Sequence, residues 1–483
     1  MITLQTSDML RVLPEIVLSV FGVLVMVLEP FVPSGSKRLL GWLALLGVLG
    51  AGAATAKISV DPGPAFGGSV AADDFGFYFI YLFVLVAALV ILGSMDYLER
   101  DQSQHGEFYA LILLGTVGMC FMASSTDLIM IFLGLEISSI ATYILAGFRR
   151  SDKLSNEASL KYFLLGSFAT AFFLYGIAFV YGLTGTTNLL GASVLMGNPL
   201  YWSIFARVAL VLMFVGVAFK LSTVPFQIWT PDVYQGAPAP VTAFLSVGPK
   251  AAAFAILLRV FLGGFSTAGA GTFWLLWTSA ALTMTLGNLA ALWQTNIKRL
   301  LAYSSIAHAG YILVGVTAGG SRGVPAVMYY LMAYALMNVG VFVLIAHLSG
   351  AGERYLEIDD YTGLAFQRPA VAACLTVFFL SLAGFPSTAG FLGKFYVFRA
   401  AMHSHLIGLT VLALLNSVVS VYYYLRIVVA MYMHEGKSET AAVVLRWPAR
   451  TAVATSILGI FYLGLAPNVF VGLTTLAAIP LLK

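Results

Sequence analysis

Charged residues are scarce in this sequence. Only 10% of the 483 residues are Asp, Glu, Lys or Arg, whereas a soluble domain carries about 25%. Apolar residues make up 60% of the chain, and the mean hydropathy is +0.93. This balance excludes an ordinary soluble globular protein and predicts an integral membrane protein. Because no basic tract or nucleic-acid-binding motif is present, a nucleic-acid partner is not expected.

Cysteine is also rare. Cys120 and Cys374 lie in apolar runs far apart in the chain, which indicates neither a disulfide framework nor a metal site. Phosphate-binding glycine-rich loops, nucleophile elbows and haem motifs are missing as well. We therefore expect no redox or hydrolytic centre, and no cofactor, within this chain. The N-terminus lacks a charged region followed by a small-residue cleavage site, so the first apolar run is expected to stay in the membrane.

Long apolar runs dominate the rest of the sequence. A membrane helix needs about 20 mostly apolar residues. About fourteen runs fit this length, at 12–32, 38–57, 75–97, 107–124, 127–148, 157–184, 202–235, 240–264, 270–293, 298–318, 325–349, 369–402, 405–433 and 448–473. The fold class predicted is an all-α polytopic membrane protein.

Two of these runs are too long for one straight helix. The seventh contains Val224-Pro225, and the twelfth contains Gly384-Phe385-Pro386. Both have a lysine nearby, which favours discontinuous helices that place polar backbone at mid-membrane. A simple proline kink is the alternative.

Short sequence echoes indicate an internal repeat. The fifth run contains SSIATYILAG from Ser138, and the tenth contains SSIAHAGYILVG from Ser304. The sixth begins with KYFLLGSF and the eleventh with YYLMAYAL, and the two broken runs again differ by five helices. An odd offset predicts inverted repeats over spans 4–8 and 9–13, although apolar segments also resemble one another by chance. The expected parts are 1–100 (three helices), 107–264 (first repeat), 270–433 (second repeat) and 448–483 (C-terminal helix).

Loop charges predict the orientation in the membrane. Most loop cations follow odd-numbered spans, among them Arg149, Arg150 and Arg354, whereas Lys57 and Arg322 follow even-numbered spans. Cytoplasmic loops carry the excess of Lys and Arg. The odd loops are therefore expected in the cytoplasm and both termini on the opposite side, which in a bacterial inner membrane is the periplasm.

Four charged residues fall inside predicted membrane helices. Glu136 lies near the centre of the fifth span, Lys220 precedes the break in the seventh, Lys250 follows Gly248-Pro249 in the eighth, and Lys394 follows the break in the twelfth. Intramembrane charges are costly and mark ion pathways. A Glu136–Lys220 pair that opens and closes would change how firmly the lysine holds a proton. A static ion pair, or lysines that reach the interface, is the alternative.

Other polar residues are weaker candidates. His308 in the tenth span suits a proton relay, and Lys161 lies near the start of the sixth span, where it is equally able to reach the interface. Gln227 and Asp232 follow the seventh-span break and are expected to admit water. Lys298 and Arg299 more often report topology. The run from 353 to 360 is expected to be a solvated loop that contacts a partner.

These residues lie in motifs that resemble a known family. The segments GLEISSIATYILAGF, FKLSTVPFQIWTPDVYQGAPAPVTAFLSVGPKAAAF, NIKRLLAYSSIAHAGYILVG and GFPSTAGFLGKFYVF are similar to the antiporter-like subunits of respiratory complex I, the proton-pumping NADH:quinone oxidoreductase. The resemblance covers essentially the whole chain. The L-type subunit carries a long C-terminal extension, and the M-type has a glutamate where this chain has Lys394. The resemblance is therefore to the N-type subunits of bacteria.

The resemblance implies roles for the matching residues. Glu136 resembles the glutamate that modulates the neighbouring lysine, and Lys220 resembles the lysine that takes up the proton. Lys250 resembles the connecting lysine, and Lys394 the residue near the periplasmic exit. Gln227 departs from relatives with histidine at that position; glutamine cannot titrate, so proton entry there would run through water or another residue.

The resemblance also implies partners and cofactors. Lys161 and His308 resemble the supporting polar chain between the half-channels. NADH, FMN, iron–sulfur clusters and quinone are expected in other subunits, with the M and K subunits as neighbours in the bilayer. Two alternatives remain open: a cation/proton antiporter subunit of a multi-subunit sodium/proton exchanger, and a purely structural membrane subunit.

Overall fold

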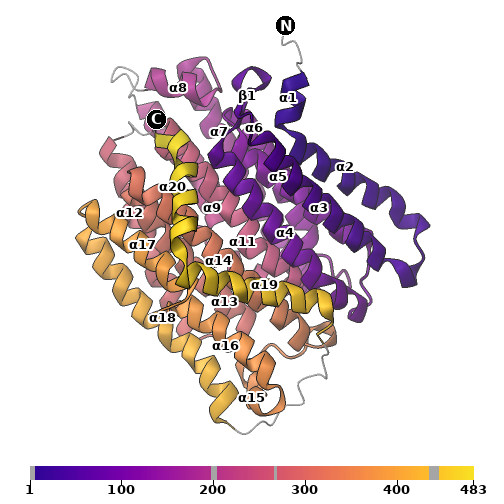
Figure 1. Ribbon diagram of the computed structural model, residues 1–483. Helices are drawn as coiled ribbons and strands as arrows, with labels where there is room; N and C mark the ends of the chain where they lie inside the picture. The colour runs from indigo at the N-terminus through magenta and orange to yellow at the C-terminus, as the bar shows by residue number, and fades with distance from the viewer. Residues whose placement is uncertain (1–5, 197–203, 266–268, 435–444, 483) are drawn as a thin grey trace.

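The computed structural model describes residues 6–196, 204–265, 269–434 and 445–482, and most of its helices run side by side (Figure 1). The helices are α1 (Thr6–Arg11), α2 (Leu13–Leu28), α3 (Arg38–Ile58), α4 (Asp74–Arg100), α5 (Gly106–Ser124), α6 (Leu128–Ala146), α7 (Lys153–Thr184), α8 (Leu189–Met196), α9 (Ile204–Leu221), α10 (Thr230–Gly236), α11 (Ala239–Ile256), α12 (Gly269–Leu292), α13 (Ile297–Ala318), α14 (Gly320–Leu348), α15 (Leu364–Gln367), α16 (Pro369–Ala383), α17 (Ala389–His403), α18 (Ile407–Met433), α19 (Trp447–Leu465) and α20 (Pro467–Leu482).

The membrane class of the fold is confirmed. Among the described residues, thirteen helices are long and apolar enough to cross a membrane. The predicted twelfth span is the exception, because it consists of two shorter helices, α16 and α17. The thirteen helices, together with α16 and α17 counted as one passage, account for the fourteen predicted spans. Helix α1 and the last turn of α20 lie at the same end of the bundle (Figure 1), as an even number of passages requires.

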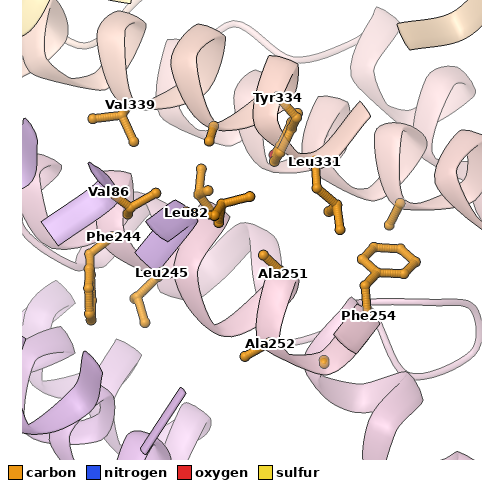
Figure 2. Close-up of a cluster of buried hydrophobic side chains, with 14 of the residues drawn as sticks. Leu82, Val86, Phe244, Leu245, Ala251, Ala252, Phe254, Leu331, Tyr334 and Val339 are labelled. Carbon is orange, nitrogen blue, oxygen red and sulfur yellow. The ribbon is translucent and has the colours of Figure 1, made fainter. Parts of the chain in front are cut away.

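Helix α11 forms the centre of the bundle and is buried along its whole length. Figure 2 shows Leu82 and Val86 of α4 meeting Phe244 of α11 on one side and side chains of α14 on the other. Ala251 and Ala252, which follow Lys250 in the sequence, have small side chains, so neighbouring helices approach the backbone closely. A lysine on this helix is therefore removed from both lipid and bulk water.

Both predicted helix breaks are confirmed. Helix α9 ends at Leu221, and Ser222 takes a left-handed φ of +61°. Helix α16 ends at Ala383, and Gly384 has φ +91°. Backbone groups freed by a break at membrane depth must find other partners. Side chains supply them: Trp229 Nε1 donates to Phe219 O at 3.0 Å, and Lys394 Nζ donates to Ala383 O at 2.9 Å.

The two repeats are visible in matching helix caps. Asp127 accepts hydrogen bonds from the first-turn amides of α6, and Asn296 does the same for α13. Each cap residue also forms an isolated β-bridge, Asp127 with Asn188 and Asn296 with Glu357. Both partners in the second bridge stand 169 residues after those in the first (127 to 296, 188 to 357). Helices α5–α11 and α12–α18 are therefore the two five-span copies.

The structural register of the repeat differs from the sequence echo. The SSIA echo relates Ser138 to Ser304, 166 residues later. Close helix contacts agree with 169 instead: a Cβ on Gly118 would meet Ser138, and a Cβ on Gly287 would meet Ala307. The echo is thus about one helical turn out of register. In the structural register, Ser305 is the counterpart of Glu136.

The predicted last span, 448–473, is present but ends earlier, at Leu465, and the single C-terminal helix predicted over 448–483 is instead two helices. The chain forms α19 and α20, which meet at an angle (Figure 1). Ala466 leaves helical geometry with ψ +56°, and Pro467 begins α20. Proline lacks a backbone N–H and is tolerated at the first helical position but not inside a helix. A short antiparallel hairpin of β1 (Gly63–Ala65) and β2 (Val70–Ala72), between α3 and α4, was also not predicted.

Candidate functional site

Four lysines of the described chain are buried, and three of them are the intramembrane lysines that the sequence singled out. Lys220 on α9 is 4% exposed, Lys250 on α11 is 1% exposed, and Lys394 on α17 is 4% exposed. None of the three has a carboxylate within 4.0 Å among the ion pairs of the described residues. Because buried ammonium groups without a counter-ion are expensive, what surrounds each lysine decides whether it holds or releases a proton.

Aromatic rings surround Lys220. Its Nζ donates to the Tyr162 hydroxyl at 3.2 Å and lies 4.8 Å from the Tyr162 ring centre and 5.0 Å from that of Tyr143. A cation over an aromatic face is stabilised by the ring quadrupole. Trp229, from the broken segment, stacks on Tyr162 with ring centres 4.5 Å apart. The break in the seventh span thus places an aromatic wall against the lysine.

Glu136 does not form the ion pair expected with Lys220. No contact within 4.0 Å joins their charged atoms, and Glu136 Oε1 is buried without a hydrogen-bond partner in the described part of the chain. Its half-buried side chain lies on α6, whose outward face also carries exposed Ile137 and Ile140. The predicted pair is open in this structure, and Tyr162 contacts the lysine instead.

Ser305 connects the two repeats at Lys250. The ammonium of Lys250 donates to the Ser305 carbonyl at 3.0 Å and also to its hydroxyl. That hydroxyl accepts a hydrogen bond from Tyr334 at 2.8 Å and lies 3.3 Å from the Tyr234 hydroxyl. Tyr234 and Lys250 belong to the first repeat, whereas Ser305 and Tyr334 belong to the second. One hydroxyl therefore contacts groups from both copies.

A second polar cluster surrounds His308. Its Nδ1 is hydrogen-bonded to the Tyr330 hydroxyl at 2.8 Å and its Nε2 to the Tyr424 hydroxyl at 3.2 Å. Tyr424 is in turn hydrogen-bonded to Ser304, the chain neighbour of Ser305. The predicted relay histidine thus has a hydroxyl on each ring nitrogen and is linked through Tyr424 to Ser304, next to the Lys250 cluster.

Lys394 contacts the break of its own span. Besides its bond to Ala383 O, its Nζ donates to Ser417 Oγ at 3.0 Å. It lies 5.2 Å from the ring centre of Tyr311, whose hydroxyl accepts a hydrogen bond from Asn288 at 2.8 Å. Lys220 lies before its break and Lys394 after its own, so the two halves differ in where the lysine stands, as the sequence indicated.

Lys161 lies in an ion-pair cluster and is not part of the buried lysine row formed by Lys220, Lys250 and Lys394. Its Nζ is 2.7 Å from Asp232 and 2.7 Å from Glu157, and its side chain is 40% exposed. Asp232 on α10 also binds Arg299 at 2.7 Å. This carboxylate therefore joins the sixth and tenth spans through the broken helix. Gln227 is half-buried, and its Oε1 has no hydrogen-bond partner among the residues described.

The expected solvated loop at 353–360 begins with a buried carboxylate. Glu353 Oε2 is 2.7 Å from Lys298 Nζ, and its Oε1 accepts hydrogen bonds from Tyr97 at 2.7 Å and from the Ala239 amide at 2.6 Å. Burial by itself raises the pKa of this carboxyl, but Lys298 and the donated hydrogen bonds outweigh burial and lower the pKa below its ordinary value. Lys298 is therefore a buried structural cation and not only a topology signal.

Sequence reasoning missed the groups that link the lysines. Their polar side chains are common in membrane helices, and the missed residues are Tyr162, Tyr234, Asn288, Tyr330, Tyr334 and Tyr424. The available signal is the density of tyrosines and paired serines next to the intramembrane charges. No group of three His, Cys, Asp or Glu able to hold a metal occurs in residues 6–196, 204–265, 269–434 and 445–482.

Comparison with known proteins decides the family. The family described as "NADH:quinone oxidoreductase/Mrp antiporter, TM" matches residues 125–420. NADH-quinone oxidoreductase subunit N 1 of Solibacter usitatus (strain Ellin6076) is 52% identical over 466 residues, which cover 96% of this chain and 95% of the relative. The chain belongs to the NADH-quinone oxidoreductase subunit N family. The resemblance seen in the sequence motifs is thereby confirmed.

Solved structures agree with membership in the subunit N family. A chain of respiratory complex I from Thermus thermophilus with bound Aureothin superposes with a TM-score of 0.80 at 36% identity, covering 95% of this chain and 98% of that one. A chain of the Mrp complex from Dietzia sp. DQ12-45-1b superposes with a TM-score of 0.84 over 98% of both chains, but at 22% identity. The second likeness shows a shared fold alone. Glu136, Lys220, Lys250 and Lys394 all lie within the region that the family match covers.

Proposed function

We propose that this subunit N translocates protons across the membrane as part of an NADH:quinone oxidoreductase. The observation that carries the proposal is the connection at Ser305, where hydroxyls from both repeats meet the buried ammonium of Lys250. Proton transfer needs neighbouring groups that both donate and accept, and hydroxyls and imidazoles do so. Lysines buried in hydrocarbon without a fixed counter-ion suit sites that load and unload a proton.

Each buried group has a part in the proposed route. Lys220 takes up a proton from the cytoplasmic side, and Glu136 modulates its affinity. Lys250 connects the half-channels, and Lys394 passes the proton to the opposite side. In support, the helices of the three lysines are linked by packing. Helix α11, which carries Lys250, contacts α9 with Lys220, and it also contacts α14, which packs against α17 with Lys394. His308, with Lys161 as a more exposed accessory, assists the transfer.

The energy must come from elsewhere in the complex. Moving one charge against 100 mV costs about 2.3 kcal/mol, so the protonation changes must be linked to a driven two-state element. We assign this element to the Glu136–Lys220 contact, open here, and to the two broken helices. NADH, FMN, iron–sulfur clusters and quinone belong to other subunits, and this chain contributes the translocase part of the enzyme.

The same proposal places the chain in its surroundings. The bacterial inner membrane is its location, both termini face the periplasm, and the antiporter-like M subunit and the small K subunit are its neighbours. Helix α1 and the end of α20 lie at the same end of the bundle (Figure 1), which supports the placement of both termini on the same side of the membrane. The excess of Lys and Arg in the loops that follow odd-numbered spans supports the cytoplasmic assignment of the other end.

The experiment is ion transport in inside-out vesicles carrying the assembled complex. We expect NADH to drive proton uptake that is independent of sodium, and Lys250→Met to lower the uptake while the complex still assembles on a native gel. Proton flux driven by a sodium gradient without NADH would favour the exchanger instead. Normal uptake in assembled Lys250→Met would contradict the route proposed through Ser305.

A further inference from the structure

A cavity of about 180 Å³ lies between α14, α17 and α20. It opens near the first turn of α14, at Ser321 and Arg322, and continues two turns deeper to Tyr329. Figure 1 shows α20 on the outside of the bundle beside α14 and α17. The cavity is therefore a gap at the membrane-facing surface, separate from the buried lysine row.

The open end of the cavity is positively charged. Arg322 and Arg399 both line it and are exposed, and neither has a carboxylate within 4.0 Å in the described chain. No Asp or Glu is among the described residues that line the cavity. The first backbone amides of α14 and the Ser321 hydroxyl add hydrogen-bond donors to the same end, because the first N–H groups of a helix lack partners within it.

The inner part of the cavity is apolar. Pro325, Ala326 and Val471 line it, and the Tyr329 hydroxyl is already used, because it donates to Leu463 O at 2.6 Å. A cavity with cations at one end and apolar walls at the other matches an amphiphile.

We propose that this cavity binds an anionic phospholipid. The lipid phosphate lies between Arg322 and Arg399. A planar guanidinium group can donate two hydrogen bonds at once to the oxygens of a phosphate. The glycerol and the start of an acyl chain lie against Pro325, Ala326 and Val471. A lipid held there would fasten α20 to α14 and to α17, the helix that carries Lys394. Basic pockets between membrane helices bind anionic head groups on the cytoplasmic side of membranes, and the proposed site uses the same chemistry on the opposite side.

Photolabelling of the assembled complex tests the proposal. The probes are photoactivatable phosphatidylglycerol and photoactivatable phosphatidylcholine, and labelled peptides are mapped by mass spectrometry. We expect phosphatidylglycerol to label α14, α17 and α20, with occupancy about fivefold lower for each arginine removed and about 25-fold lower in Arg322→Gln/Arg399→Gln. Arg207→Gln, on an exposed arginine of α9 outside the cavity, should leave the labelling unchanged.

Three results would overturn the proposal. Equal labelling by the two lipids on the unaltered complex would show that the charge plays no part, and this comparison needs no variant. Loss of labelling in inorganic phosphate at an ionic strength matched by chloride would assign the site to a free anion. Unchanged labelling in the double variant would show that the two arginines do not bind the lipid. Retained labelling in Arg322→Lys/Arg399→Lys would instead support the charge contact.

Discussion

Lys250 and Ser305 come from opposite repeats, yet the ammonium of Lys250 donates hydrogen bonds to both the carbonyl and the hydroxyl of Ser305. In the 169-residue register of the two copies, Ser305 takes the place that Glu136 holds in the first copy. One copy therefore has a carboxylate and the other a hydroxyl at equivalent positions. A hydroxyl both donates and accepts, so the second copy can pass a proton on where the first holds a charge.

Replacing Ser305 with alanine should interrupt the connection between the repeats. The change removes the hydroxyl that Lys250, Tyr234 and Tyr334 share, while Lys250 keeps its bond to the backbone carbonyl at position 305. Because one hydrogen bond contributes about 1 kcal/mol, we expect proton uptake in vesicles to fall about fivefold or more while the complex assembles. Ser456→Ala is the matched control, since the buried Ser456 hydroxyl has no hydrogen-bond partner among described residues. Equal uptake in the two variants would remove Ser305 from the route.

Replacing Glu353 with glutamine should destabilise the subunit. Lys298, whose side chain is 0% exposed, would lose its partner, and breaking a buried ion pair costs about 3–5 kcal/mol. We expect a lower temperature of thermal inactivation and less assembled complex. Glu353→Gln/Lys298→Met should recover part of the loss, because no charge is then left buried alone. A double variant less stable than the single would contradict this account.

The contribution of Glu353 should also depend on pH. Its folded-state pKa is lowered from the ordinary value of 4.5, despite burial, by Lys298 and the surrounding donors. A group with a lowered pKa stabilises fully above its unfolded pKa and loses that contribution as pH falls through the folded value. The difference in inactivation temperature between wild type and Glu353→Gln should be constant above about pH 6 and shrink below about pH 4. A difference that is largest at acid pH would be inconsistent with this sign.

Gly384→Ala should disturb Lys394. Gly384 has φ +91°, and a Cβ there would lie 3.2 Å from Lys394 Cδ and 3.4 Å from its Nζ. A side chain in the left-handed region costs about 1–2 kcal/mol, so we expect the break to shift, the Lys394–Ala383 bond to weaken and proton uptake to fall severalfold. Gly408→Ala is the control, because nothing lies within 4 Å of its added Cβ. Matching uptake in the two variants would argue against a role for this geometry.

Much of the fold was predictable because membrane helices leave strong signals. Pro225 and Pro386 marked both breaks, and lysines inside apolar runs marked the buried row, since each feature is expensive in hydrocarbon unless structure compensates it. The repeat was predictable too, but its register was not. Short segments such as SSIA match between membrane helices by chance. The structural register instead follows from the helix caps, in which Asp127 and Asn296 occupy equivalent positions.

Other features depend on tertiary packing. Ser305 lies beside Ser304 in an apolar helix, and only the packing of α10, α11 and α14 against α13 shows that it joins three groups. Glu353 lies in a polar run that has the composition of a surface loop, and its burial depends on Lys298 from a distant span. Partners separated by more than fifty residues are set by tertiary packing, so composition alone does not reveal them.

The central claim is that the buried lysines carry protons, and Lys220→Met tests it most directly. The measurement is NADH-driven proton uptake in inside-out vesicles, with assembly checked on a native gel and Lys153→Met, on an exposed lysine of α7, as the control. We predict that uptake collapses in assembled Lys220→Met and stays normal in Lys153→Met. Normal uptake in an assembled Lys220→Met complex would contradict the account and leave a structural role for this subunit.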